Sequence, residues 1–191
     1  MKKIGKIIIC AILIIGLTGC KGSEKMKGLH HVQINVRDYG TITLELDADT
    51  APITVKNFID LANDKFYDGL TFHRIISNFM IQGGAFLEDG SYKEAKTIKG
   101  EFSLNNVKND IEHVRGVISM ARADDMNSAS SQFFIVQKDS PHLNGAYAAF
   151  GRVTSGIEIV DEIANNTIVS GSNGEVLEEN RPVIESIVVL D

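Results

Sequence analysis

Short apolar segments, each bounded by a turn rich in Gly or Asn, recur along most of the sequence and constrain its fold more than any other feature. Residues 32–36 and 42–46 alternate apolar and polar side chains around residues 37–40, which predicts a β-hairpin. Further short strands are expected at residues 71–76, 79–82, 116–120, 132–136, 149–153 and 183–190. Strands and helices do not alternate as they would in a parallel sheet. We therefore predict a mainly β fold, a closed antiparallel barrel that leaves no sheet edge exposed.

Two segments, well separated in the sequence, predict helices. In the first, Thr50 can cap the helix, Pro52 lies in the first turn, and apolar residues 55, 58, 59 and 62 share one face. In the second, Ser155 is followed three residues later by Glu158, which predicts a capping box before apolar residues 159, 160 and 163.

The N-terminal segment differs in composition from the rest. Three lysines in the first six residues precede an apolar run at residues 7–17. This run has the length of a signal-peptide apolar region and is shorter than the roughly 20 residues that a membrane-spanning helix needs. It ends in the residues LTGC, which resemble the lipobox of bacterial lipoprotein signals and make Cys20 the expected lipidation site.

The resulting organisation is a signal peptide at residues 1–19, the lipidated Cys20 with a tether at residues 20–28, and one globular domain at residues 29–191. An uncleaved N-terminal anchor helix is the alternative, and both alternatives place the domain on the extracytoplasmic side of the cell membrane. Cleavage would remove three lysines and no acid, so the formal net charge would change from −6 to −9. Anionic lipid would repel a domain with this negative charge, so membrane attachment of the domain would depend on the acyl chains.

Charge and residue usage exclude several classes of function. The net charge of −6 and the absence of a basic cluster argue against nucleic acid as a partner. The two cysteines, Cys10 and Cys20, both precede the domain, which leaves it without thiol or disulfide chemistry. The histidines lack the spacing of a zinc site; the adjacent His30 and His31 could bind a metal but are better explained as solvated surface residues. We expect no metal and no cofactor.

An arginine stands within a strongly apolar stretch at residues 72–84, which read FHRIISNFMIQGG. Strand alternation predicts that Phe72 and Arg74 share one face. His73 and Ile75 would then lie on the opposite face. Burying an unpaired guanidinium is very costly, so Arg74 must have a functional role or an acidic partner.

A second apolar stretch complements the first. In residues 131–136, Gln132 and Phe134 are expected on one face, and Phe133 and Ile135 on the other. Together with Arg74, these segments predict a small apolar hollow with one fixed cation.

Four blocks of sequence resemble the signature blocks of the cyclophilin family, in the family's order. They are residues 72–84, GVISMA at 116–121, SQFFI at 131–135, and LNG at 143–145 with FGRV at 150–153. The resemblance implies an eight-stranded antiparallel barrel capped by two α-helices, with a peptide groove on its outer face. It also implies catalysis of cis/trans exchange at X-Pro bonds.

Residue by residue, the resemblance makes Arg74 the catalytic cation and implies a substrate-binding set around it. Gln82 would orient Arg74 and bind the substrate backbone. The full substrate-binding set comprises Phe79, Met80, Gln82, Ala121, Arg122, Gln132, Phe134, Leu143 and Tyr147.

Three positions depart from the family pattern. Arg122 stands where the family usually has Asn, and the change should alter preference for flanking residues more than the chemistry. His142 stands where many eukaryotic relatives have a Trp that is important for cyclosporin. Tyr147 replaces a frequent groove His and offers another ring against proline.

The sequence thus predicts a monomeric peptidyl-prolyl cis-trans isomerase that acts on proline-containing segments of exported proteins at the membrane surface. The alternative is a non-catalytic chaperone or assembly factor that binds proline-containing segments through the same groove. A solute-binding lipoprotein is disfavoured because such proteins usually need two domains.

Overall fold

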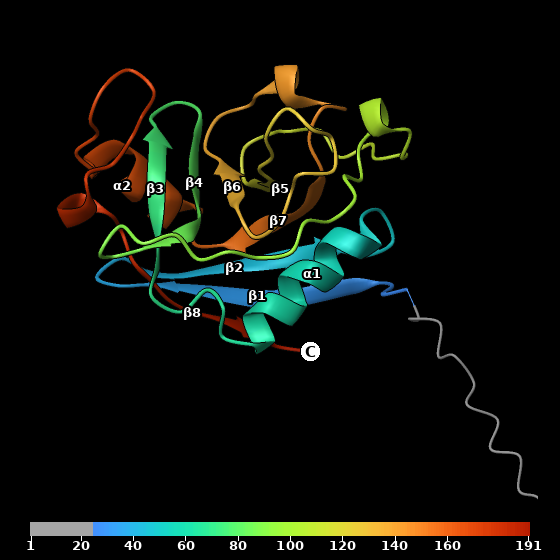
Figure 1. The fold of residues 1–191 in the computed structure, drawn as a ribbon, viewed down its shortest axis with the longest axis horizontal. Coiled ribbons are helices and arrows are strands. Elements are labelled where there is room, and N and C mark those ends of the chain that lie inside the picture. The colour runs from blue at the N-terminus through green and yellow to red at the C-terminus, as the bar shows by residue number, and fades with distance from the viewer. Residues whose placement is uncertain (1–24) are drawn as a thin grey trace, which may run out of the picture.

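The computed structural model describes residues 25–191, whose strands form one eight-stranded antiparallel sheet that closes almost completely into a barrel (Figure 1). Neighbouring strands follow the order β3-β4-β6-β5-β7-β2-β1-β8. The outer strands of this order, β3 and β8, meet through hydrogen bonds from Phe72 N to Pro182 O and from Gly69 N to Ile184 O, both 2.9 Å. The predicted mainly β barrel is confirmed. Its strands are β1 (Leu29–Val36), β2 (Gly40–Asp47), β3 (Leu70–Ile76), β4 (Met80–Leu87), β5 (Val117–Met120), β6 (Phe133–Val136), β7 (Ala149–Ser155) and β8 (Ile184–Val189).

Two α-helices pack against the barrel, α1 (Pro52–Asn63) against β8 and β2, and α2 (Ile157–Asn166) against β2 and β4. The buried face of α1 carries the predicted apolar residues, and Phe58 is central among them. Its ring centroid lies 5.1–5.4 Å from those of Tyr67, Phe133 and Phe150. This aromatic contact fixes α1 to the barrel core. Three short 3₁₀ helices complete the elements: η1 (Ser103–Asn105), η2 (Pro141–Leu143) and η3 (Glu178–Asn180).

The N-terminus of α1 is capped from a distant part of the chain. Thr50 does not cap it as predicted, because its hydroxyl donates to Asp47 Oδ2 at 2.7 Å. The buried carboxylate of Glu101 instead accepts hydrogen bonds from Ile53 N at 3.1 Å and Thr54 N at 2.8 Å. These bonds satisfy backbone donors that no helical carbonyl can reach.

The predicted capping box of α2 is also wrong. Ser155 is the last residue of β7, and Gly156 is the N-cap with φ 86° and no side-chain cap. A Cβ at this position would collide with Thr41 O, so both the left-handed backbone and the close contact require glycine. Glu158 remains in the first turn, where the helix dipole favours a negative charge.

A β-bulge in β3 changes the predicted alternation around the arginine. Phe72 pairs with Gly83 and Arg74 pairs with Gln82. Two steps along β3 are therefore matched by a single step along β4. The extra residue shifts the alternation, so that Phe72 and Ile75 both enter the barrel core. The prediction that Phe72 and Arg74 share a face is therefore wrong.

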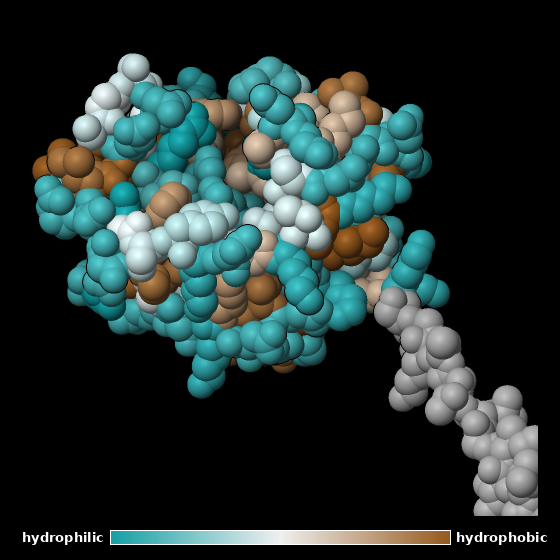
Figure 2. Space-filling view, viewed as in Figure 1, coloured by the Kyte–Doolittle hydropathy of each residue, from teal (hydrophilic) through white to brown (hydrophobic). Residues whose placement is uncertain are grey.

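A second apolar cluster lies apart from the barrel core. Phe134 belongs to it, whereas Phe133 and Ile135 belong to the core, as the alternation in β6 predicts. Elsewhere, apolar residues on the face seen in Figure 2 form separate patches among hydrophilic ones. The buried members of the second cluster are Met80, Val117, Phe134, Val136, Leu143 and Ala149.

The predicted signal peptide and Cys20 lie outside the described residues. Within residues 25–191, no helix has the length and apolarity needed to cross a bilayer.

Candidate active site

A small cavity of about 140 Å³ lies over the second apolar cluster. Its size suits one small side chain better than a larger organic ligand, because drug-sized ligands occupy pockets of roughly 300–1,000 Å³. The lining comes from β3, β4 and the turn between them, from β6, from the η2 segment, and from the loops after β5 and η2. It consists of nine of the ten residues predicted for the site: Arg74, Phe79, Met80, Gln82, Ala121, Arg122, Phe134, Leu143 and Tyr147.

The apolar wall of the cavity is rigidly supported. Met80, Phe134 and Leu143 are buried, and the ring of Tyr147 meets Phe134 edge-on at a centroid distance of 5.8 Å. Phe79 lies 5.5 Å from the ring of His142 at the edge of the site. A flat apolar ligand group would therefore contact aromatic rings already held in place.

Beneath Phe134, His113 forms a second layer that the sequence did not assign to the site. The two rings stack at 6.0 Å, and His113 Nε2 lies 3.0 Å from Ser119 Oγ. Its Nδ1 lies 3.2 Å from Asn144 Oδ1. Burial lowers the pKa of His113, which favours a neutral ring under the apolar wall.

Arg74 supplies the positive charge at the mouth of the cavity. Its Nε donates to Asn173 O at 3.0 Å, its Nη2 to Asn173 Oδ1 at 3.3 Å, and its Nη1 to Gln82 Oε1 at 3.3 Å. Gln82 in turn donates through Nε2 to Gln132 Oε1 at 3.0 Å. Neutral oxygens orient the guanidinium, and no carboxylate within residues 25–191 forms an ion pair with it. The alternative that Arg74 is a structural arginine paired with an acid is therefore not found among the described residues.

Arg122 lies at the rim with its guanidinium already engaged. Nε donates to Ala146 O at 3.0 Å, and the guanidinium carbon lies 4.8 Å from the centroid of the Tyr147 ring. This arrangement fixes Tyr147 by a cation–π contact, and backbone carbonyl oxygens hold the guanidinium of Arg122 in place.

Gln132, the tenth predicted residue, lies in an adjoining hollow of about 310 Å³. That hollow shares Gln82, Ala121 and Arg122 with the cavity, so the two adjoin. Besides His113, sequence reasoning missed Asn173. The turn residues around it predict a loop, but nothing in them indicates contact with Arg74, which lies 99 positions earlier.

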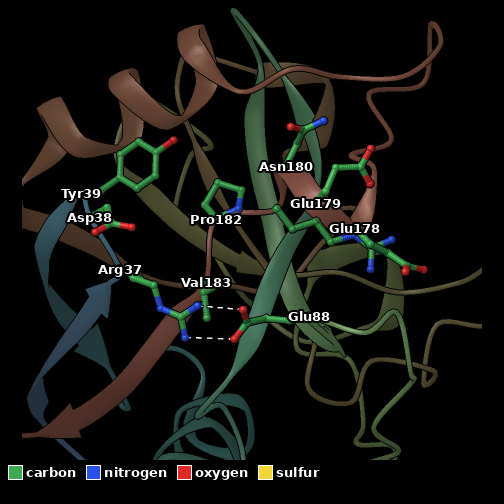
Figure 3. A pocket seen from close by; sticks show the side chains of 10 residues that line it. Arg37, Asp38, Tyr39, Glu88, Glu178, Glu179, Asn180, Pro182 and Val183 are labelled. Carbon is green, nitrogen blue, oxygen red and sulfur yellow. Dashed lines mark hydrogen bonds and ion pairs between the residues drawn. The ribbon is translucent and has the colours of Figure 1, made fainter.

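A larger hollow of about 570 Å³ has a different character (Figure 3). Arg37 and Glu88 face each other across it in a bidentate ion pair, with N–O distances of 2.7 and 3.0 Å. Because its wall is mainly polar and Glu88 neutralises the charge of Arg37, it is a weaker candidate for catalysis than the apolar cavity.

In the part of the chain that the structure describes, no three His, Cys, Asp or Glu side chains come together as metal ligands. His31, one of the pair considered for metal binding, places Nδ1 2.7 Å from Asp191 Oδ2. His30 places Nε2 3.1 Å from Lys27 O.

Comparison with known proteins agrees with this geometry. Residues 31–189 match the family model described as cyclophilin type peptidyl-prolyl cis-trans isomerase/CLD. Peptidyl-prolyl cis-trans isomerase B of Bacillus subtilis is 43% identical over 146 residues, 76% of this chain and 93% of that protein. Peptidyl-prolyl cis-trans isomerase A of Dickeya dadantii is 37% identical over 165 residues, 83% of this chain and 84% of that protein. A cyclophilin from Cryptosporidium parvum, crystallised in the presence of the dipeptide Ala-Pro, superposes with a TM-score of 0.71 at 29% identity, covering 84% of this chain and 99% of the other.

Proposed function

The chain belongs to the cyclophilin family of peptidyl-prolyl cis-trans isomerases, and we propose that it isomerises X-Pro bonds of exported proteins at the membrane surface. The observation that carries the site assignment is Arg74, a cation held by neutral oxygens at the mouth of an apolar cavity. The Ala-Pro dipeptide with the Cryptosporidium parvum relative supports a proline-containing ligand.

The cavity binds the proline ring of the substrate in this proposal. Phe79, Met80 and Phe134 offer apolar surface to the ring, while Arg74 and Gln82 face the peptide backbone. Burying the ring next to these side chains excludes water from the bond that rotates.

Arg74 lowers the barrier to rotation by stabilising the twisted amide. Resonance in the planar peptide bond gives a barrier of about 18–20 kcal/mol. When the bond twists, the nitrogen regains a lone pair, which the guanidinium can hydrogen-bond. An arginine stays protonated in proteins and cannot act as a general acid, so its contribution is electrostatic and is greatest in the transition state.

The energy required is modest. Uncatalysed X-Pro exchange takes roughly 10–100 s. A turnover near 10 s⁻¹ therefore requires an acceleration of about 100- to 1,000-fold, or about 3–4 kcal/mol. One hydrogen bond to a charged group contributes about 1.5–3 kcal/mol, so Arg74 together with desolvation of the amide is sufficient.

Attachment to the membrane rests on the sequence of residues 1–20, the apolar run followed by LTGC. Lipidation of Cys20 would tether the domain by residues 20–28 on the extracytoplasmic side, where emerging exported chains are unfolded. Folding limited by proline isomerisation would then be accelerated at the site of export.

Arg74→Ala in the full-length chain tests the catalytic assignment. We expect kcat/KM for a proline tetrapeptide to fall by about 10- to 100-fold, which corresponds to one charged hydrogen bond. Peptide binding should change little, because the apolar wall is intact. Arg152→Ala is the matched control, since Arg152 is exposed and pairs with Glu45 outside the cavity.

The same experiment separates the enzyme from a non-catalytic chaperone. A wild-type chain that binds proline peptides without accelerating their exchange would support the chaperone. Full activity in the Arg74→Ala variant would reject Arg74 as the catalytic cation while leaving the isomerase activity itself in place.

A further inference from the structure

Arg74 also borders a second hollow of about 490 Å³, which we call the acidic hollow. Asn173, which holds Arg74 Nε and Nη2, lines this hollow, whereas Gln82, which holds Nη1, lines the proline cavity. The guanidinium therefore separates two adjoining depressions. The residues that give the acidic hollow its character are Arg74, Phe86, Glu175, Leu177, Glu178 and Glu179, all of which line it.

The rim of the hollow carries carboxylates that are not engaged in ion pairs within residues 25–191. Glu175, Glu178 and Glu179 are exposed, and none forms an ion pair or a side-chain hydrogen bond within residues 25–191. Figure 3 shows Glu178 and Glu179 on the η3 side of the neighbouring hollow, where the ion pair drawn joins only Arg37 and Glu88.

The positive charges of the hollow are held at its floor. Arg181 is partly buried, donates from Nε to Val176 O at 3.0 Å, and places its guanidinium carbon 5.6 Å from the centroid of the Phe86 ring. Arg74 is oriented by Asn173 and Gln82. A cationic ligand group would be repelled from the floor and attracted to the carboxylates at the rim.

The hollow also offers apolar surface to a side-chain stem. Leu177 is 49% exposed at its edge, and Phe86 and Val176 line it further in. Lysine and arginine side chains combine a long apolar stem with a charged end, and they place the stem on apolar surface while the charge stays near water. The arrangement of apolar wall and acidic rim fits that shape.

We propose that the acidic hollow is a subsite that binds a lysine or arginine side chain of the peptide whose proline occupies the cavity; this rests on the proposed function of the cavity. Because the two depressions share Arg74, and an extended chain advances about 3.3–3.6 Å per residue, the basic residue lies one to three positions from the proline. The enzyme thus prefers positively charged client segments.

A matched peptide series tests the subsite with the full-length chain. Each peptide has the same Ala-Pro centre and carries lysine, norleucine or glutamate at one position, from three residues before to three residues after the proline. Norleucine keeps the stem of lysine without its charge. At one or more positions, we expect kcat/KM for the lysine peptide to exceed that for the norleucine peptide by about two- to fivefold, as for an exposed ion pair. The glutamate peptide should be the slowest there.

The triple variant Glu175→Gln/Glu178→Gln/Glu179→Gln should abolish the lysine preference while leaving turnover of the norleucine peptide unchanged. The control Glu112→Gln/Glu158→Gln/Glu162→Gln removes the same charge from exposed positions that do not line the hollow, and it should retain the preference. Equal rates for lysine and norleucine peptides would overturn the proposal, as would a preference that survives the first variant or disappears in the control. A failure of the proposed function is distinct, because the norleucine peptide itself would then not be accelerated.

Discussion

Asn173 holds Arg74 through two of its own atoms, the carbonyl oxygen at 3.0 Å from Nε and Oδ1 at 3.3 Å from Nη2. The loop that carries Asn173 docks directly on β3, because Ile75 N donates to Gly174 O at 2.7 Å. A Cβ at position 174 would collide with Ile75 O, so glycine permits this approach. The orientation of the candidate catalytic cation is therefore set by a loop distant in the sequence.

Replacing the side-chain acceptor should weaken catalysis without removing the site. In Asn173→Ala, the carbonyl still accepts from Nε, but Nη2 loses its acceptor, so we expect kcat to fall by about two- to tenfold. The peptide Kd, measured by calorimetry, should not change. Ser172→Ala is the control from the same loop. A proportional loss of peptide affinity, or a large drop in Tm, would indicate a structural role in place of positioning.

Glu101 should be important for stability and unimportant for chemistry. Its carboxylate accepts from Ile53 N, Thr54 N and Thr54 Oγ1, and Glu101→Gln would turn one acceptor into an amide donor facing these groups. We expect the free energy of unfolding in urea to fall by about 1–2 kcal/mol. Glu94→Gln, at an exposed position of the preceding segment, should have no effect. Equal stability of the two variants would show that the cap contributes nothing.

His73 should make the protein less stable in mild acid. Burial, followed by the positive charge of Arg181, lowers the pKa of His73 to about 4, whereas an unfolded histidine titrates near 6.5. Between these values the unfolded chain binds a proton that the folded chain does not, so stability is present above pH 6.5 and is lost as the pH falls toward 4. The loss from this residue should be on the order of 3 kcal/mol.

Urea titrations at pH 7 and pH 4.5 measure this effect. The difference in unfolding free energy should be clearly smaller in His73→Gln than in the wild type, with a remainder from His113, whose pKa is also lowered by burial. His142→Gln, which changes an exposed histidine, should keep the wild-type difference. An undiminished pH dependence in His73→Gln would contradict the assignment.

Cys20→Ser should separate location from activity. If Cys20 carries the lipid anchor, the variant should lose acyl labelling and leave the membrane fraction, while kcat/KM remains that of the wild type. Cys10→Ser is the matched control, since it lies in the segment to be removed and should leave labelling intact. Persistent labelling of the Cys20→Ser chain would refute the lipidation prediction.

Local patterns in the sequence determined the hairpin of β1 and β2, the buried faces of both helices and the segments that carry the site. Apolar alternation specifies which side of a strand enters the core, as in β6, where Phe133 and Ile135 belong to the barrel core and Phe134 does not. The family resemblance of these segments was sufficient to identify nine of the residues that line the cavity.

The tertiary structure alone decided the bulge before Arg74, the cap that Glu101 provides and the contact with Asn173. In the cap and in the Asn173 contact, a polar group takes a partner that local sequence does not reveal, 47 residues away for Thr54 and 99 for Arg74. The entropy of closing a loop rises only slowly with its length, so distant partners compete with near ones on almost equal terms. The partner of each polar group is set by which groups come together when the barrel closes. Only in the closed barrel do these buried polar groups all find hydrogen-bond partners.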